Sequence, residues 1–475
     1  MKRTQNRRQF VKRLGMTGLG FMGLQSFLLQ STCTNAMTTN LSKMKYGALR
    51  EDPLGIFNLP KGFSYKIISK KGDKMDDGLL VPGRCDGMAT FEGKDGRVII
   101  VRNHEINIEK DEIKLGNTAF GKKNELMAKI DRSKLYDIGK DDFPGLGGTT
   151  TMVYNPETQK VETQYLSLGG TYRNCAGGPT PWGSWITCEE TVVKAGEVGG
   201  MVGKNHGYCF EVPASETVGL VKAVPLKDMG RFNHEAIAVD PKTSIVYLTE
   251  DRWDGLFYRF IPNVPGELEK GGRLQALAII DNKSTDTRNW SELTGDKFPI
   301  GQPMEVTWID MKDVDSPYDE LRYEGFKRGA TRFARGEGIT WGNGEAYIAC
   351  TNGGQIKKGQ IFRYKPSVDE GTDTEKAHPG TIELFAEPNN ISLLQNCDNL
   401  TIAPWGDVIT CEDTDDPPRI IGITPQGEFY VLGMNVGYNS ELAGVTFSPD
   451  GNTLFVNIQH EGLTLAITGD WKGGA

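Results

Sequence analysis

The chain has 475 residues, and 59 Gly with 23 Pro make up about one residue in six, against an average of about one in eight. Because both residues end helices and form turns, this composition excludes a long helical bundle or coiled coil. The formal charge is -8, but the first 33 residues hold six basic and no acidic residues, which leaves -14 for the rest. An acidic body argues against nucleic-acid binding and fits a protein that collects cations.

The first 33 residues read as an export signal. Residues 6–12 form the twin-arginine pattern Asn-Arg-Arg-Gln-Phe-Val-Lys, and a weakly apolar, Gly-rich stretch follows that is too short to span a membrane. We predict a twin-arginine (Tat) signal peptide over 1–33, a linker over 34–47 and one folded domain over 48–475. The Tat export machinery would deliver it to the periplasm or the extracellular space, with a lipid anchor at Cys33 left open.

Eight cysteines are spread along the chain, and none forms a Cys-x-x-Cys pair. The sequence therefore signals neither a zinc knuckle nor a thioredoxin-type site. Free or metal-bound thiols are typical of a protein that folds in the reducing cytoplasm before export.

Six segments repeat one pattern of strand, tight turn and strand, with Gly, Asn or Asp at the turn. They cover residues 86–105, 175–189, 235–251, 337–352, 398–412 and 441–460. The second and fifth copies match most closely, and loops of very different length separate the copies. Six such units predict an all-β fold, a six-bladed β-propeller with long inserted loops, in preference to a β-sandwich.

Metal-binding residue types recur at two places in each copy. The start of the first strand, which lines the channel of a propeller, carries Asp86, Cys175, Glu235, Glu337, Asp398 and Glu441. The end of the second strand carries Glu105, Glu189, Glu250 or Asp251, Asn352, Glu412 or Asp413, and Gln459 or His460. Carboxylates packed together repel one another unless cations neutralise them.

A ring of metal ligands follows from this recurrence. Calcium prefers six to eight oxygen ligands, and a lone thiolate among carboxylates indicates a second, softer metal. We predict that the ligands are Cys175, Glu235, Glu337, Glu105, Glu189, Asp251, Asp398 and Glu412.

Residues next to these positions have other expected roles. Cys188, Cys350 and Cys411 precede the second-strand position by one residue, so they should face the blade core. His104 and His234 each precede a predicted ligand, and we expect them to orient ligands rather than to bind metal.

The motifs together resemble the PhoX-type alkaline phosphatase family. The matching stretches are Arg102-Asn-His-Glu105, residues 174–190, Arg231-Phe-Asn-His-Glu235, Arg335-Gly-Glu337, residues 398–400 and residues 447–460. The resemblance implies a propeller with a mixed iron–calcium cluster in its channel. It also implies hydrolysis of small phosphate monoesters outside the cytoplasm, and we expect a monomer.

The resemblance also assigns single residues. Cys175 matches the iron-binding cysteine, and Glu235 matches a cluster carboxylate. Arg335 and Glu337 match the catalytic Arg-x-Glu pair, in which the Arg holds phosphate and the Glu binds a metal. Gly336 stands between them where the family usually has Pro.

A second phosphate contact of the family is replaced in this chain. An Asn that helps to bind phosphate lies near the stretch 147–155, where this sequence has Thr149-Thr150-Thr151. We therefore expect Thr150 to take the place of that Asn.

Two other functions stay open. A calcium-dependent, lactonase-like propeller hydrolase would need calcium without iron, and Cys175 would be dispensable. A non-catalytic exported binding propeller would use its metals for structure alone, which the change at Thr149–Thr151 allows.

Overall fold

The computed structural model describes residues 45–140 and 143–472. The predicted signal peptide and Cys33 lie outside these residues, and both stay predictions. The described residues belong to one compact unit, and within the predicted linker the ring of Tyr46 packs edge-on against Phe63 at 5.2 Å between centroids. Among the described residues, no helix has the length and apolar character needed to cross a membrane.

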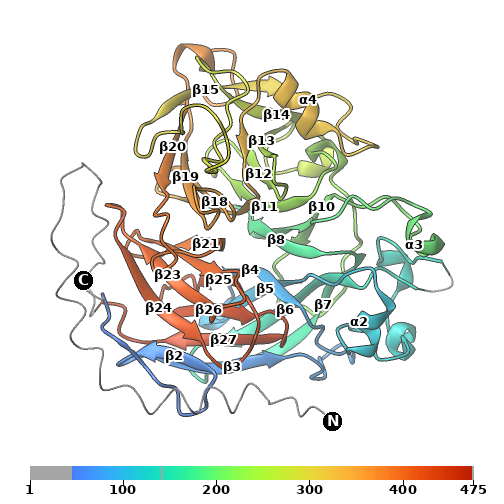
Figure 1. Ribbon diagram of the computed structural model, residues 1–475. Coiled ribbons are helices and arrows are strands. Elements are labelled where there is room, and N and C mark those ends of the chain that lie inside the picture. Colours follow the sequence, from blue (N-terminus) through green and yellow to red (C-terminus); the bar gives the residue numbers. More distant parts are fainter. Residues whose placement is uncertain (1–44, 141–142, 473–475) are drawn as a thin grey trace, which may run out of the picture. The chain divides into compact units, whose positions relative to one another are not determined.

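Six antiparallel strand pairs, one for each predicted repeat, form the centre of the fold (Figure 1). They are β4 (Cys85–Glu92) with β5 (Val98–His104), β8 (Asn174–Pro179) with β9 (Ser184–Glu189), β11 (His234–Val239) with β12 (Val246–Glu250), β17 (Gly336–Gly342) with β18 (Glu345–Cys350), β21 (Cys397–Ile402) with β22 (Val408–Glu412), and β25 (Leu442–Phe447) with β26 (Thr453–Ile458). The first strands contact one another in a closed ring, in the order β4, β8, β11, β17, β21, β25 and back to β4. The all-β, propeller-like arrangement is therefore confirmed.

Outer strands extend four of these pairs into separate sheets. The added strands are β6 (Gly147–Asn155) and β7 (Lys160–Thr171) on β5, β10 (Cys209–Pro213) on β9, β23 (Arg419–Ile423), β24 (Phe429–Asn435), β2 (Phe57–Pro60) and β1 (Leu49–Arg50) on β22, and β27 (Leu463–Thr468) and β3 (Ser64–Lys70) on β26. The start of the described chain thus completes the last two sheets, since β3 pairs with β27 and β2 with β24.

The prediction of six separate blades is wrong, because the other two pairs belong to one ten-stranded sheet. Its remaining strands are β13 (Gly255–Pro262), β14 (Gly272–Ile279), β15 (Met304–Asp310), β16 (Arg332–Phe333), β19 (Gln360–Lys365) and β20 (Thr381–Ala386). β15 pairs with β14 on one side and with β20 on the other. A free sheet edge exposes unpaired N–H and C=O groups. The single strand β15 pairs with the edges of both β14 and β20.

Helices are short and lie in the connecting loops. Within residues 45–140 and 143–472, the α-helices are α2 (Lys110–Lys114), α3 (Glu197–Gly200) and α4 (Leu321–Lys327), and the 3-10 segments are Lys94–Gly96, Glu125–Lys129, Arg132–Lys134, Lys227–Met229, Leu268–Lys270 and Glu375–Ala377.

A β-bulge interrupts each central strand pair, where two residues of the first strand face one residue of the second. In five pairs the first bulged residue is a predicted channel ligand: Asp86, Cys175, Glu235, Glu337 or Asp398. In the sixth pair the bulge begins at Gly444 instead. Bulges re-aim side chains, so this repeated irregularity turns the predicted ligands toward the axis.

The residue after the ligand is small at four of these bulges, because neighbouring first strands approach closely there. A Cβ on Gly87 would lie 2.6 Å from the Cα of Ala176, and one on Gly338 would lie 2.7 Å from the Cα of Asn399. Both distances are to backbone atoms, which cannot move aside cheaply. Glycine at these two positions therefore allows the ring to close around the ligands.

We expect Gly338→Ala to destabilise the protein by roughly 1–3 kcal/mol, because the added methyl group overpacks the ring. Gly219→Ala is the matched control, since nothing lies within 4 Å of a Cβ at Gly219. Chemical denaturation of both variants measures the difference. Equal stabilities would contradict the close approach of the central strands.

Candidate metal centre and phosphate site

Two overlapping groups of ligand atoms meet at the axis. One atom from each of Cys175, Glu190 and Glu235 lies within 4.8 Å of the other two, and the same holds for Glu235, Glu337 and Asp398. All five side chains are buried. Glu235 belongs to both groups, and its carboxylate accepts no hydrogen bond from the described residues. The structure therefore brings four of the predicted ligands together and adds Glu190.

Burial and mutual repulsion raise the pKa values of these groups. The pKa of Glu235 lies well above its usual range, mainly through burial and then through Glu337. Burial, and then Glu235, raises the pKa of the Cys175 thiol in the same way. These groups can be ionised together only if cations bind among them. A thiolate and several carboxylates with spare lone pairs are a suitable ligand set for metals.

Arg335 lies at the edge of this cluster, directly before β17. Its Nε and Nη2 atoms donate to the two carboxylate oxygens of Asp251, each at 2.7 Å, and its Nη1 donates to Asn352 Oδ1 at 3.1 Å. It also forms an ion pair with Glu337. Glu337 and then Asp251 raise the pKa of the guanidinium, which stays charged. The two-point contact with Asp251 fixes its plane beside the cluster.

Arg173 occupies the corresponding position two residues before Cys175. Its guanidinium donates to Glu105 Oε1 at 2.8 Å and forms an ion pair with Glu190. Both Arg173 and Arg335 have positive φ angles, 46° and 51°, a conformation that non-glycine residues rarely adopt. The repeated backbone geometry holds two arginines beside the acidic cluster.

Asp86 and Glu105 complete another side of the axis. Gln459 Nε2 donates to Asp86 Oδ2 at 2.7 Å and to Glu105 Oε2 at 2.9 Å. Burial and the charge of Glu105 raise the pKa of Asp86 well above its usual range. The predicted residue Glu105 thus lies at the cluster, bonded to both Arg173 and Gln459.

The structure does not bring the predicted residue Glu189 to the cluster. Its carboxylate accepts hydrogen bonds from the backbone N–H groups of Tyr172 at 3.1 Å and Gly207 at 2.9 Å, and it contacts His206 Nδ1 at 2.5 Å. Burial lowers the pKa of His206, but Glu189 and Asp137 outweigh this and raise it to about 9. Glu189 therefore has a structural role, and the next residue, Glu190, faces the axis.

Glu412 is turned away in the same manner. Its carboxylate accepts hydrogen bonds from Arg419 Nε at 2.8 Å and from the backbone N–H of Gln395 at 2.8 Å. Burial raises the pKa values of Glu337 and Asp398, and the charge of Asp413, the alternative that the sequence left open, raises both further.

The strand register explains why Glu190 and Asp413, rather than Glu189 and Glu412, occupy the equivalent positions. The residue before each bulge is Cys85, Asn174 or Cys397, and these pair with His104, Glu189 and Glu412 respectively. Glu105 directly follows the paired residue His104. The equivalent residues in the other two strand pairs are therefore Glu190, which follows Glu189, and Asp413, which follows Glu412. Aligning the repeats by paired strand positions, with Cys85 opposite His104 and Asn174 opposite Glu189, would have identified Glu190 from the sequence.

The remaining predicted contacts lie elsewhere. Thr150 is fully buried on β6, where its hydroxyl contacts Arg102 Nη2 at 3.1 Å and His104 Nε2 at 2.9 Å, so the expected phosphate contact is not at the cluster. His234 Nδ1 lies 3.4 Å from Cys209 Sγ and its Nε2 lies 2.9 Å from the carbonyl oxygen of Gly230. Neither imidazole ring hydrogen-bonds a cluster side chain, although the Cys175 thiol donates to the backbone carbonyl oxygen of His234 at 3.4 Å.

The prediction that three cysteines face the cores of the sheets is confirmed. Cys188, Cys350 and Cys411 are fully buried, each in a different hydrophobic cluster.

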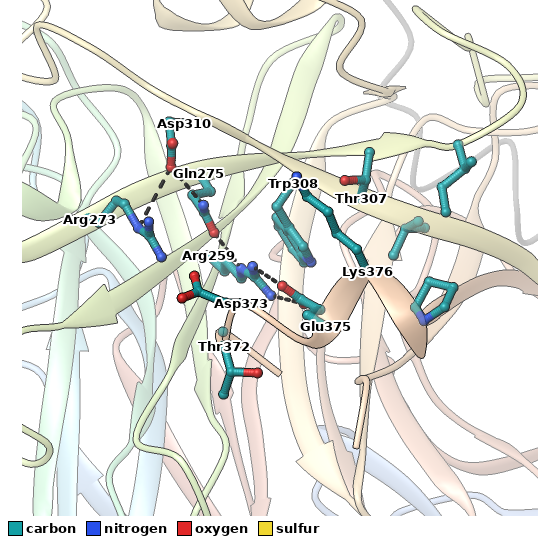
Figure 2. A pocket seen from close by; sticks show the side chains of 14 residues that line it. Arg259, Arg273, Gln275, Thr307, Trp308, Asp310, Thr372, Asp373, Glu375 and Lys376 are labelled. Carbon is teal, nitrogen blue, oxygen red and sulfur yellow. Dashed lines mark hydrogen bonds and ion pairs between the residues drawn. The ribbon is translucent and has the colours of Figure 1, made fainter. Parts of the chain in front are cut away.

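A cavity of about 500 Å³ lies away from the axis, beside β13, β14 and β15. Figure 2 shows Arg259 there, directed at Glu375 and lying over the ring of Trp308. Arg259 also donates to Glu370 at 2.7 Å and to Gln275 at 2.8 Å. These contacts already satisfy its charge, and no predicted ligand lines this cavity, so the axis remains the candidate site.

We expect Glu190→Gln to lower the metal content of the folded protein with little change in melting temperature. Glu189→Gln should have the opposite effect, a loss of about 3 kcal/mol in stability with metal content retained, because it breaks a buried ion pair. Elemental analysis and thermal denaturation of the two variants test this. Loss of metal from Glu189→Gln alone would show that the sequence register was right.

Comparisons with known proteins agree with this geometry. The chain matches the family model described as alkaline phosphatase PhoX over residues 44–462. PhoX from Pseudomonas fluorescens, solved in complex with vanadate, a transition state analogue, is 17% identical and has a TM-score of 0.60, covering 88% of this chain and 97% of that chain. At that identity the likeness shows the fold.

Other solved structures are more distant. A Xanthomonas campestris gluconolactonase has a TM-score of 0.40 and 10% identity, covering 86% of this chain and 96% of its own. Virginiamycin B lyase from Staphylococcus aureus has a TM-score of 0.37 and 11% identity, covering 86% and 99%. No curated protein sequence matches the chain. Because the family model spans nearly all of the described residues, this protein belongs to the PhoX family of alkaline phosphatases.

Proposed function

We propose that this protein hydrolyses phosphate monoesters at the axial cluster, with iron and calcium as its metals. The observation that carries the proposal is the position of Arg335, a charged guanidinium fixed at the edge of a buried group of metal-binding side chains. Cations among the acids and an arginine beside them provide two complementary contacts for a phosphate group.

The two groups of ligand atoms differ in chemistry. Cys175, Glu190 and Glu235 combine a thiol with carboxylates, which suits iron. Glu235, Glu337 and Asp398 offer oxygen alone, which suits calcium. When bound, such metals neutralise phosphate oxygens and the charge that develops in the transition state. Glu235 would contact both ions because its carboxylate belongs to both groups.

The residues around the metals position the substrate. Arg335 has a planar fork of donors, which matches two oxygens of a phosphoryl group. Asp251 and Asn352 hold that fork in place through three hydrogen bonds. Arg173 lies on another side of the cluster, held by Glu105 and Glu190. Both arginines reach the phosphate already oriented, which lowers the entropy cost of binding.

We expect Cys175→Ser to lose its iron and at least about 100-fold of its turnover of phosphate monoesters, while calcium is retained. The hydroxyl is a poorer ligand for a soft metal, and the nearly equal volume preserves the packing. Cys350→Ser, at a buried thiol away from the cluster, is the control that should keep both metals.

The outcome separates the functions that the sequence left open. Full turnover without iron would favour a calcium-dependent hydrolase, whereas iron and calcium without any turnover would favour a binding propeller. The first result would remove iron from the proposal but leave the phosphatase activity, and the second would overturn the phosphatase proposal.

We expect Arg335→Lys to lower kcat/KM for a phosphate monoester by roughly 100-fold, since the ammonium keeps the charge but loses the two-point contact. Inhibition by vanadate should weaken by a similar factor, because it probes the same contacts. Arg273→Lys, in the cavity of Figure 2, is the matched control. Unchanged kinetics in Arg335→Lys would remove this residue from the phosphate site.

A further inference from the structure

A second cavity, of about 480 Å³, opens directly beside the axial cluster. Arg173, Glu190, Asn233 and Arg252 line the side nearer to the cluster. Glu190 also supplies a ligand atom to the group with Cys175 and Glu235, so the cavity and the cluster share a wall. Its volume lies within the range of small-molecule sites, roughly 300–1,000 Å³. Whatever is attached to a phosphate held at the cluster can enter this space.

The far side of the cavity is made by two loops, residues 192–194 after β9 and residues 317–319 before α4. Arg231 ties these loops together from a fully buried position. Its guanidinium donates to the carbonyl oxygens of Val193 at 3.4 Å, His206 at 2.7 Å and Ser316 at 3.0 Å. A charged group satisfied entirely by the backbone of two loops fixes their separation. The cavity is therefore a built part of the fold.

The far side is also chemically distinct from the cluster. Val192, Val193 and Pro317 contribute apolar groups beside the charged Lys194, Glu197 and Asp319, and Tyr318 is 81% exposed. The ammonium of Lys194 lies 5.3 Å from the centre of that ring and is held by the carbonyl oxygen of Pro317 at 3.2 Å. An aromatic ring that remains largely uncovered at the wall of a cavity offers a surface for stacking.

We propose that this cavity binds the alcohol portion of the substrate and favours planar aromatic groups, with Tyr318 as the residue that determines this specificity. The inference rests on the proposed function, since it names the class of ester that the phosphatase prefers. Nucleoside monophosphates are the natural form of such an ester, because a base stacks readily on an exposed aromatic side chain.

The test compares adenosine 5′-monophosphate with ribose 5-phosphate, which both carry the phosphate on the 5′-oxygen of ribose and differ in the base. Purified, metal-loaded wild type should show at least about 10-fold higher kcat/KM for the nucleotide, mainly through a lower KM. Tyr318→Ala should bring the ratio near 1 by raising KM for the nucleotide alone. Tyr323→Ala removes another exposed ring, outside this cavity, and should leave the ratio unchanged.

The possible results distinguish this inference from the proposed function. Equal kcat/KM for the two esters in wild type, or a ratio that Tyr318→Ala leaves unchanged, overturns the aromatic site and leaves the phosphatase intact. Hydrolysis of neither ester by the metal-loaded protein overturns the phosphatase and this inference with it. Melting temperatures confirm that both variants are folded, since each ring is exposed.

Discussion

The rest of the structure depends on the convergence of buried negative charge on one axis. Glu235, Glu337 and Asp398 lie with ligand atoms within 4.8 Å of one another, and each has a pKa raised by burial and by its neighbours. Left alone, such a group would push its strands apart or take up protons. The closed ring opposes the first outcome, because each first strand is hydrogen-bonded to its partner strand and packed against its two neighbours in the ring. Cations held among the carboxylates would prevent the second.

The bulges make this arrangement possible within ordinary antiparallel pairs. A regular strand places alternate side chains on opposite faces, and a ligand at the first strand would then compete with the packing of its sheet. An extra residue at Asp86, Cys175, Glu235, Glu337 or Asp398 breaks the alternation at one point. The cores beyond the bulge keep their apolar pattern, so the metal-binding residues cost the sheets little packing.

The inner set stood out in the sequence because each copy carries an acid or a thiol at one position. Of the second set, Glu105 and Asp251 lie beside the cluster, where Glu105 bonds Arg173 and Asp251 bonds Arg335. Glu189 and Glu412 are acidic, follow a core cysteine and stand at a strand end, so alternation alone assigns them to the axis. In the structure, Glu189 instead accepts the backbone N–H of Gly207 in the following loop, and Glu412 accepts that of Arg419 at the start of β23. Which of two adjacent acids faces the axis, as with Glu189 and Glu190, depends on how the strands pair, and the sequence alone does not show this pairing.

Fold prediction was limited by a different cause. The six hairpins are local, and their turns and alternating patterns are visible in the sequence. β15 lies in a long insertion without any repeat, and its pairing with β20 joins residues about 75 positions apart, from Met304 to Ile382. Nothing in its own composition indicates which edges it covers. Thr150 was misplaced for a related reason, since only the pairing of β5 with β6 shows that Arg102 and His104 occupy its hydroxyl.

The arginines beside the cluster follow from the same charge constraint. In the structure as it stands, Arg335 is held by Asp251 and Glu337, and Arg173 by Glu105 and Glu190. Cations bound by Glu190 and Glu337 would draw on the negative charge that these arginines now neutralise. Each guanidinium would then keep one oriented carboxylate partner and gain attraction for an external anion. Metal binding and substrate binding would thus be thermodynamically coupled through Glu190 and Glu337.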